Sequence, residues 1–396
     1  MHRIISGDVL RFAAHYRGPK FHAVLCDPPY ELGFMGKSWD SRGVSFRPET
    51  WSAIRSLLAP GAHLLAFGGA RTFHRIAIAI EDAGFEIRDT LGWLYGSGFP
   101  KSHDVSKAID REAKAVRSEG DRLWSGGMRA GGISHGGGQS GTNERLIYDT
   151  PATDAARAWQ GYGTALKPAW EPVIVARNPL VGTVAQNVQS YGAGALNIHG
   201  GRVGDDEITT LGGDKFPNLY GTYKTAHESK HLGRWPANII HDGSDDVTEV
   251  LAAAQRFFYC SKAGTREREE GLSGFEVRVA GVGDVDEESG RDSTKPKNQY
   301  GQGSRSRVEA GLPPTIPRAN HHPTVKPIAL TEYLARLILP AAVVGDRRIL
   351  VPFAGSGSEC IGAALAGWET IIGVEREDEY VRIARARMEY HGTKRD

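Results

Sequence analysis

The sequence predicts an α/β fold in which a largely parallel sheet is covered by helices. Apolar strand-like segments alternate with helical segments at both ends of the chain, and these strands end at glycine, proline or an acidic residue. The chain also has 396 residues with 40% hydrophobic content, so it can bury a sizeable core. We therefore expect one α/β sheet assembled from the two ends, with a different kind of segment between them.

The N-terminal part supplies the first half of this alternation. The expected strands are residues 3–8 (RIISGD), 21–27 (FHAVLCD), 62–69 (AHLLAFGG) and 85–95 (FEIRDTLGWLY). Trp51, Ile54 and Leu58 have the spacing of one helix, which residues 58–61 (LAPG) are expected to close. A second helix, with Ile76, Ile80 and Ala83 on one face, is expected to run up to Gly84.

The C-terminal part repeats the pattern. Expected helices cover residues 330–340, 358–367 and 378–392, and expected strands cover 347–353 and 369–375. The strand at 347–353 runs into the glycine turn 353–357 (FAGSG), and Gly367 is placed to end the helix that follows. Together these segments predict a βαβ unit followed by one more amphipathic helix.

The middle of the chain, residues 106–320, is harder to interpret. A Gly/Ser-rich stretch at 125–141 and a polar, acidic stretch at 281–300 predict loops. Residues 168–180 (PAWEPVIVARNPL) and 234–242 (RWPANIIHD) are expected strands, and 265–269 (TRERE) is expected to be a solvated face because its charges compensate.

Composition excludes several classes of protein. The net charge is only +1, so any nucleic-acid surface must come from local arrangement. The three cysteines are far apart and form no metal or redox motif, so we expect buried thiols and no metal. The N-terminus has no signal-peptide core and no run approaches the ~20 apolar residues of a membrane span. We expect a soluble, cytoplasmic protein that binds no membrane.

Residues 26–30 (CDPPY) end an apolar strand in an unusually rigid way. Pro28 and Pro29 remove two backbone N–H groups and restrict two φ angles directly after Asp27. A rigid strand exit without chemistry is one interpretation. The other is that Asp27 must be held in a fixed position beside Tyr30.

The glycine turn near the C-terminus predicts a cofactor site. Gly355 and Gly357 follow a strand and precede a helix, where the backbone can approach a ligand closely. Glu375 ends the next strand, 20 residues beyond Gly355 (375 − 355), which suits a carboxylate that binds ribose hydroxyls. An adenosine-containing cofactor is therefore expected, although Cys360 stands where a dinucleotide fingerprint has its third glycine, and a tight βα turn remains the alternative.

Together, the DPPY motif at 27–30 and the FAGSG motif at 353–357 resemble the catalytic and cofactor motifs of amino-group DNA methyltransferases. Their order, with the catalytic motif first, resembles the β class of this family, in which the strands of a Rossmann-like sheet are circularly rearranged. Residues 322–327 (HPTVKP) and 6–8 (SGD) resemble two further motifs, and 98–110 (GFPKSHDVSKAID) resembles phage-type members. Where relatives have D-P-F before the glycine turn, this chain has Val351.

The resemblance implies a catalytic half at 1–105, a variable target-recognition region at 106–320 and a cofactor-binding half at 321–396. It implies S-adenosyl-L-methionine as cofactor and double-stranded DNA as substrate, with a homodimer and a restriction-modification, orphan or phage setting as further options. The implied catalytic residues are Asp27, Pro28, Pro29 and Tyr30. The implied cofactor residues are Asp8, Phe353, Gly355, Gly357, Glu375 and Lys326, and for Lys326 the capping of a helix start is the alternative.

In the implied chemistry, Asp27 and the Pro28 carbonyl accept the hydrogens of an exocyclic amino group, while Tyr30 stacks on the flipped base. Adenine N6 is the first choice of target atom, because relatives that methylate cytosine N4 commonly carry S-P-P-Y, but cytosine N4 stays open. Cytosine C5 is disfavoured because Cys26 precedes the prolines. Glutamine methylation of a protein and a DNA-binding protein that has lost catalysis are the remaining alternatives.

Overall fold

The computed structural model describes residues 1–32, 43–96, 102–118, 150–212, 227–244, 258–279, 317–322 and 324–393. Within it the chain divides into two compact units. Unit 1 comprises Met1–Trp93, Glu171–Asp242 and Ala253–Asp396, and unit 2 comprises Leu94–Trp170 and Gly243–Ala252. The expected loops at 125–141 and 281–300 lie outside the described residues.

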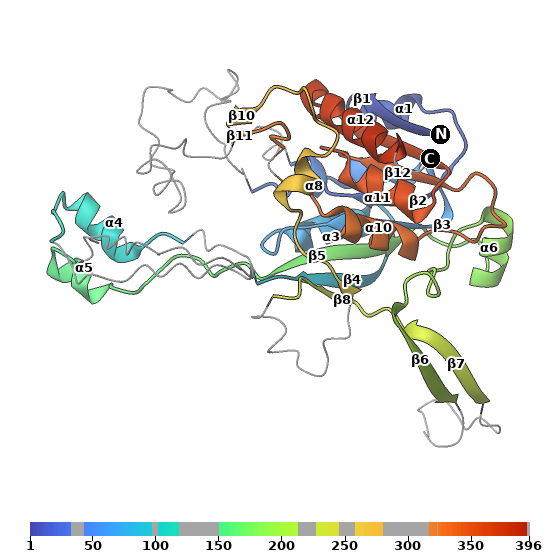
Figure 1. Ribbon diagram of the computed structural model, residues 1–396, viewed down its shortest axis with the longest axis horizontal. Coiled ribbons are helices and arrows are strands. Elements are labelled where there is room, and N and C mark those ends of the chain that lie inside the picture. The colour runs from blue at the N-terminus through green and yellow to red at the C-terminus, as the bar shows by residue number, and fades with distance from the viewer. Residues whose placement is uncertain are drawn as a thin grey trace, which may run out of the picture. The chain divides into compact units, whose positions relative to one another are not determined.

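A nine-stranded sheet dominates the structure, in the order β1-β13-β12-β2-β3-β5-β4-β8-β9 (Figure 1). Its strands are β1 (His2–Ser6), β2 (Phe21–Cys26), β3 (Leu58–Phe67), β4 (Glu86–Leu94), β5 (Trp170–Arg177), β8 (Ile239–His241), β9 (Phe258–Tyr259), β12 (Arg348–Pro352) and β13 (Thr370–Glu375). The first five strands in this order pair in parallel, and β5 runs antiparallel to β3. The predicted α/β fold with a rearranged chain order is therefore confirmed.

The helices of unit 1 cover both faces of the sheet. They are α1 (Val9–His15), η3 (Val44–Phe46), α2 (Pro48–Arg55), α3 (Phe73–Asp82), α6 (Val184–Tyr191), α8 (Thr265–Glu269), α10 (Ile328–Leu337), α11 (Ser358–Ala366) and α12 (Asp378–Thr393). In Figure 1, α10, α11 and α12 lie on the near side of the sheet. Two small antiparallel pairs complete the unit, β6 (Val203–Gly212) with β7 (His227–Arg234) and β10 (Arg278–Val279) with β11 (Pro317–Arg318).

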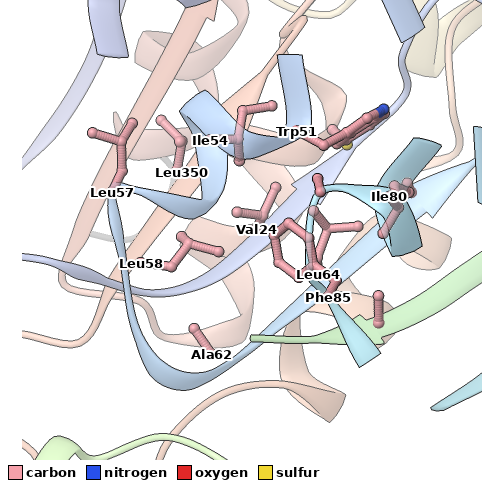
Figure 2. Close-up of a cluster of buried hydrophobic side chains, with 14 of the residues drawn as sticks. Val24, Trp51, Ile54, Leu57, Leu58, Ala62, Leu64, Ile80, Phe85 and Leu350 are labelled. Carbon is pink, nitrogen blue, oxygen red and sulfur yellow. The ribbon is translucent and has the colours of Figure 1, made fainter. Parts of the chain in front are cut away.

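The main hydrophobic core lies between the sheet and α1, α2 and α3 (Figure 2). Val24 of β2, Trp51 of α2 and Ile80 of α3 are fully buried in it. The next residue of β2, Leu25, is equally buried but belongs to the other face of the strand. This explains why β2 and β12 are continuous apolar runs, since parallel strands covered on both faces bury every side chain. Val351 is one of these buried residues.

One predicted boundary was wrong. Leu58 does not extend α2 and residues 58–61 do not close it, because α2 ends at Arg55 and β3 begins at Leu58. Leu58 pairs with Phe21 of β2, and Gly61 adopts a left-handed φ of 76° while its N–H donates to the Asn178 carbonyl. Sheet pairing with distant segments therefore overrides the local helical spacing.

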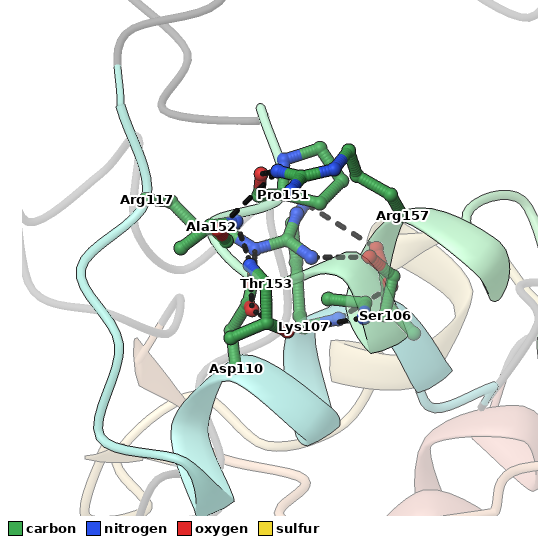
Figure 3. A network of polar contacts seen from close by, with 10 residues as sticks. Ser106, Lys107, Asp110, Arg117, Pro151, Ala152, Thr153 and Arg157 are labelled. Carbon is green, nitrogen blue, oxygen red and sulfur yellow. Dashed lines mark hydrogen bonds and ion pairs between the residues drawn. The ribbon is translucent and has the colours of Figure 1, made fainter.

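The described residues of unit 2 form two short helices, α4 (Val105–Glu112) and α5 (Asp154–Ala158). A buried carboxylate, Asp110, joins them: it accepts hydrogen bonds from the backbone N–H groups of Ala152 and Thr153 and pairs with Arg117 at 2.7 Å (Figure 3). These bonds hold the pKa of Asp110 below its usual value, although desolvation acts in the opposite direction. The network fixes the start of α5 to α4.

The three cysteines are buried thiols, as predicted. No helix in the described part of the chain is long and apolar enough to cross a membrane. Within the same residues, histidine, cysteine, aspartate and glutamate side chains form no group that could hold a metal ion. The expected strands at 168–180 and 234–242 are present as β5 and β8.

Candidate active site

The two motifs singled out in the sequence meet at the carboxyl ends of two neighbouring strands. β12 and β2 are paired in parallel through Ile349 with Ala23 and Leu350 with Val24. From β12 the chain continues through α11 to β13 on one side, and from β2 it continues through α2 to β3 on the other. In open α/β sheets this reversal of strand order is where ligands bind. The sheet thus brings the DPPY and FAGSG motifs together across 326 positions.

Strained backbone lies directly after the first motif and within the second. Glu31, directly after DPPY, has φ of 55°, and Phe353, directly after β12, has φ of 59°. Non-glycine residues rarely adopt this left-handed region, and such strain concentrates at functional sites. Side chains from neighbouring segments stabilise the first turn: Ser45 Oγ donates to the Pro29 carbonyl at 2.7 Å, and Thr72 Oγ1 donates to the Tyr30 carbonyl at 2.9 Å.

A partly buried polar cluster, formed by Asp27, Tyr30, Glu171 and Lys326, lies at this turn. Lys326 Nζ is 2.6 Å from Asp27 Oδ2, 3.0 Å from Glu171 Oε1 and 3.2 Å from the Tyr30 hydroxyl. The Tyr30 hydroxyl donates to Glu171 Oε1 at 2.5 Å. Since an ammonium has three N–H donors, Lys326 can direct one to each of the three partners. We call these four residues the Lys326 cluster.

The electrostatics of the Lys326 cluster centre on Asp27. Burial raises the pKa of Asp27, and the nearby Lys326 ammonium opposes this rise. Burial alone would lower the pKa of Lys326, but the attraction of Asp27 and Glu171 outweighs it and raises that pKa above its usual value. Lys326 is therefore a permanent cation. Asp27 Oδ1 is buried, and no described residue donates a hydrogen bond to it.

A further buried acid, Glu359, lies in the first turn of α11. Burial and then the charge of Asp27 raise its pKa to about 7. Neither Glu359 nor Glu171 was identified from the sequence, where each is a single acid at the edge of an apolar run. An acid that opens a buried strand or helix is the signal that could have found them, because unpaired carboxylates are seldom buried.

The glycine turn is held by two buried charged residues. The N–H of Gly355 donates to Glu375 Oε2 at 2.7 Å, so this acid lies directly against the turn. Arg387 of α12, which is completely buried, donates to the Ser356 carbonyl at 2.7 Å and contacts Ser358 Oγ at 3.3 Å. A methyl group on Gly355 would lie 2.8 Å from His322 Nε2, which leaves room for glycine alone. The turn is thus buried and tightly supported on both sides.

The segment that carries Lys326 is positioned by α8. Arg268 donates to the His322 carbonyl at 2.8 Å, and Glu269 accepts the Ala319 N–H at 2.9 Å. Burial lowers the pKa of His322 to about 3, so its imidazole stays neutral beside Gly355. The prediction that residues 265–269 form a solvated face was therefore wrong for Glu267, Arg268 and Glu269, whose charged groups bind backbone groups of a distant segment. It holds for Arg266, whose side chain is 91% exposed.

Asp8 lies at the same edge of the sheet, at the end of β1. Its Oδ1 accepts the N–H groups of Leu10 and Arg11 at 2.9 and 3.2 Å, which makes it the N-cap of α1. The preceding Gly7 N–H donates to the Glu375 carbonyl at 2.8 Å. The structure therefore brings Asp8, Glu375 and the glycine turn to neighbouring strand ends, with a capping role for Asp8.

A largely parallel sheet with a glycine turn at one strand end and an acid at the end of the next strand is typical of α/β proteins that bind nucleotide cofactors. The comparison with protein families is specific: the N6/N4 methyltransferase family model, described as DNA methylase, matches residues 21–386. The chain belongs to this family.

Individual relatives match this chain over a short stretch or at low sequence identity. The Type II methyltransferase M2.DpnII of Streptococcus pneumoniae is 45% identical over 71 residues, which are 18% of this chain and 25% of that protein. The match therefore spans about a quarter of this relative's length.

Two solved structures align along most of the chain. M1.HpyAVI in complex with SAM has 14% identity, a TM-score of 0.39 and coverage of 98% of this chain and 99% of that one. The cytosine-N4-specific PvuII DNA methyltransferase has 12% identity, a TM-score of 0.40 and coverage of 98% and 86%.

Proposed function

We propose that this protein transfers a methyl group from S-adenosyl-L-methionine to an exocyclic amino group in double-stranded DNA, with adenine N6 as the target. Membership of the N6/N4 DNA methylase family supports this reaction class. The observation that carries the proposal is Asp27 Oδ1, a buried acceptor without a donor among the described residues, next to the glycine turn of the adjacent strand. A buried polar atom of this kind calls for a ligand donor, because leaving it unpaired is costly.

The residues at the edge of β1, β12 and β13 fit an adenosine-containing cofactor. Gly355 and Gly357 have φ of 49° and 82°, a conformation that favours glycine, and Glu375 and Asp8 are carboxylates at neighbouring strand ends. Phe353 lies between the turn and the core. S-adenosyl-L-methionine would supply a methyl group already activated by a positively charged sulfur, so the protein needs to orient the acceptor rather than create a nucleophile.

We assign Lys326 to the catalytic side of the site rather than to the cofactor carboxylate. All three of its donors have partners in the Lys326 cluster. Its charge lowers the pKa of Asp27 and thereby favours the ionised carboxylate, which accepts hydrogen bonds but donates none. The cluster leaves Oδ1 of Asp27 available while it fixes Oδ2.

The acceptors then act on the amino group as follows. Asp27 Oδ1 accepts one amino N–H and the Pro28 carbonyl accepts the other, and Pro29 keeps both in place by restricting the chain. The nitrogen lone pair, otherwise delocalised into the base, is turned towards the methyl donor. As the nitrogen gains a methyl group it must release one proton, which Asp27 Oδ1 is placed to take.

Tyr30 is proposed to stack on the target base after it leaves the duplex. Its hydroxyl is bound by Glu171 and Lys326. Its ring packs against Gly69, where an added Cβ atom would lie 3.1 Å from Tyr30 Cδ2. A ring fixed at both ends offers a flat surface without further loss of side-chain freedom. Stacking would offset part of the few kcal/mol that base flipping costs.

The test combines methyl transfer with cofactor binding. Purified protein with labelled S-adenosyl-L-methionine and duplex DNA is expected to yield labelled DNA, and Asp27→Ala is expected to abolish transfer while S-adenosyl-L-methionine still binds. Asp206→Ala, at an exposed position on β6, is the matched control and should transfer normally. Transfer that survives Asp27→Ala, or label found only in protein, contradicts the proposal.

Nucleoside analysis of the labelled DNA separates the two amino-group targets. N6-methyladenine is the expected product, on the basis of the DPPY motif. N4-methylcytosine would keep the reaction class and the roles of the site residues but overturn the choice of base.

A further inference from the structure

Glu359 is a buried acid that the proposed reaction does not use. It lies in the first turn of α11, just beyond Gly357 of the glycine turn, and only 4% of the residue is exposed. Its carboxylate accepts a hydrogen bond from its own backbone N–H, and no other described residue donates to it. Burial of a carboxylate with so few donors is costly unless a cation lies beside it. Glu359 therefore calls for a positively charged partner.

The cations of the site do not fill this need. Lys326 directs its three donors to the other members of the Lys326 cluster. Burial lowers the pKa of this ammonium, but the charges of Asp27, Glu171 and Glu359 together raise it. Arg387, the other cation near Glu359, is bound to the glycine turn and is attracted most strongly by an acid of α8. Three carboxylates thus act on one ammonium, and a cationic ligand would balance the excess negative charge.

The position of Glu359 indicates which cation this is. Among the charged groups around it, Asp27 acts on it most strongly. Asp27 Oδ1 is the proposed acceptor for the amino group, and the glycine turn that precedes Glu359 follows the strand paired with β2. For methyl transfer the donor sulfur must lie in line with the amino nitrogen, and hence close to Asp27. The positively charged sulfur of the methyl donor therefore falls within electrostatic reach of Glu359.

We propose that Glu359 attracts the positively charged sulfur of S-adenosyl-L-methionine and thereby lets the site distinguish this donor from the product S-adenosyl-L-homocysteine, whose sulfur is neutral. The inference rests on the proposed function for the identity of the cofactor and adds the residue that selects it. The two compounds share the adenosine and the amino-acid part, so the methyl group and its charge are the whole difference. Because this charge is lost when the methyl group leaves, Glu359 favours binding of the donor and release of the product rather than the transfer step itself.

The experiment compares the two compounds in the absence of DNA. Calorimetry gives the Kd of each for the wild-type protein and for Glu359→Gln, which keeps the size of the side chain and removes its charge. The Kd for S-adenosyl-L-methionine should rise about tenfold or more and that for S-adenosyl-L-homocysteine less than about twofold, because unit charges within about 10 Å interact this strongly at an effective dielectric constant of about 20. Glu359→Asp, which keeps the charge, should retain part of the preference. Glu49→Gln, at an exposed glutamate in the first turn of α2, is the matched control and should change neither Kd.

The pH dependence of binding gives a second readout. Burial and then the charge of Asp27 raise the pKa of Glu359 to about 7, and two cations oppose this rise. The titratable or charged groups that interact with Glu359 are Asp27, Lys326, Arg387, Cys26 and Cys360. Both thiols stay protonated, because burial raises their pKa values well above the usual range.

The sign of the pH effect follows from the ionised carboxylate being the form that attracts the cation. Affinity for S-adenosyl-L-methionine should rise between about pH 6 and about pH 8, with release of a proton on binding. S-adenosyl-L-homocysteine is the reference, because its amino-acid part titrates in the same range. Glu359→Gln should abolish the difference between the two pH profiles.

The outcomes distinguish this inference from the proposed function. An equal loss of affinity for both compounds in folded Glu359→Gln would assign the residue to their shared part or to support of the glycine turn, and would overturn the inference even if DNA is methylated. An unchanged Kd for S-adenosyl-L-methionine would overturn it as well. Selective loss of S-adenosyl-L-methionine affinity supports it even if the protein transfers no methyl group to DNA. A wild-type protein that binds neither compound would overturn both proposals.

Discussion

Replacement of Lys326 by methionine tests the central electrostatic argument of the active site. Methionine keeps an unbranched chain that can fill the same space but removes the ammonium 2.6 Å from Asp27 Oδ2. Asp27 and Glu171 would then face each other without a counter-ion. Because Lys326 lowers the pKa of Asp27, its removal must raise that pKa.

The size of the effect follows from the distance. At 2.6 Å and an effective dielectric constant of about 20, Coulomb's law gives about 6 kcal/mol for the pair. At 1.36 kcal/mol per pKa unit this is an upper bound of about four to five units, before water enters the site or the carboxylates move apart. We expect a rise of about two units, roughly half this bound, in the pKa of Asp27. This pKa controls the acid limb of the pH–rate profile, that is, the fall in rate at low pH.

The assay is the pH dependence of kcat/KM for DNA between about pH 5 and 10. The carboxylate form of Asp27 is the active form, so wild-type activity falls as pH drops through the raised pKa of Asp27. In Lys326→Met the acid limb should move about two units to higher pH. The loss relative to wild type then reaches about a hundredfold at pH values below both limbs and becomes smaller as the pH rises. Activity should recover in part at alkaline pH.

The result that refutes this reasoning is a folded variant whose rate is lower at every pH while its acid limb stays in place. Lys326 would then act through shape and not through charge. Lys230→Met, which removes the exposed ion pair between Lys230 of β7 and Glu207 of β6, is the control and should change neither the limb nor the rate.

Three further predictions concern other residues. Glu171→Gln should shift the acid limb to lower pH, opposite to Lys326→Met, because the Glu171 charge raises the pKa of Asp27; a pH–rate profile checks this, and a shift to higher pH would contradict it. Gly362→Val should destabilise the fold, because even a Cβ atom at this position would lie 2.5 Å from the Glu332 backbone nitrogen, where α10 and α11 pack. A fall in Tm is expected, and an unchanged Tm would show that the two helices can move apart without loss of stability. Arg387→Met should lower the free energy of unfolding by about 3 kcal/mol and weaken S-adenosyl-L-methionine binding, because the glycine turn loses its charged donor. Denaturant unfolding measures the first effect and calorimetry the second. Unchanged cofactor binding would show that Arg387 does not hold the turn in its binding conformation.

Much of the fold could be predicted because local sequence and tertiary structure agree there. The helix α11 ends at Gly367, with φ of 103°, and β13 ends at Glu375, both as their sequences indicate. The failure at Leu58 has the opposite cause: the helical spacing is real, but pairing with Phe21 and burial in the sheet stabilise the strand more. The prediction for residues 265–269 failed in part for a similar reason, since compensating charges do not reveal that Glu267, Arg268 and Glu269 bind backbone groups of a distant segment.

The sequence by itself determined the class of the sheet, the DPPY turn and the glycine turn, and it indicated that Asp27 and Gly355 belong to one site. These features are local, since proline, glycine and strand-ending acids restrict the chain wherever they occur. Only the tertiary structure decided the surroundings of Asp27. Lys326 lies 299 positions away and Glu171 lies on the antiparallel strand β5, so their contacts with Asp27 and Tyr30 depend on strand order and not on any neighbouring residue. Coulomb interactions act through space, and the pKa of Asp27 is therefore a property of the folded sheet.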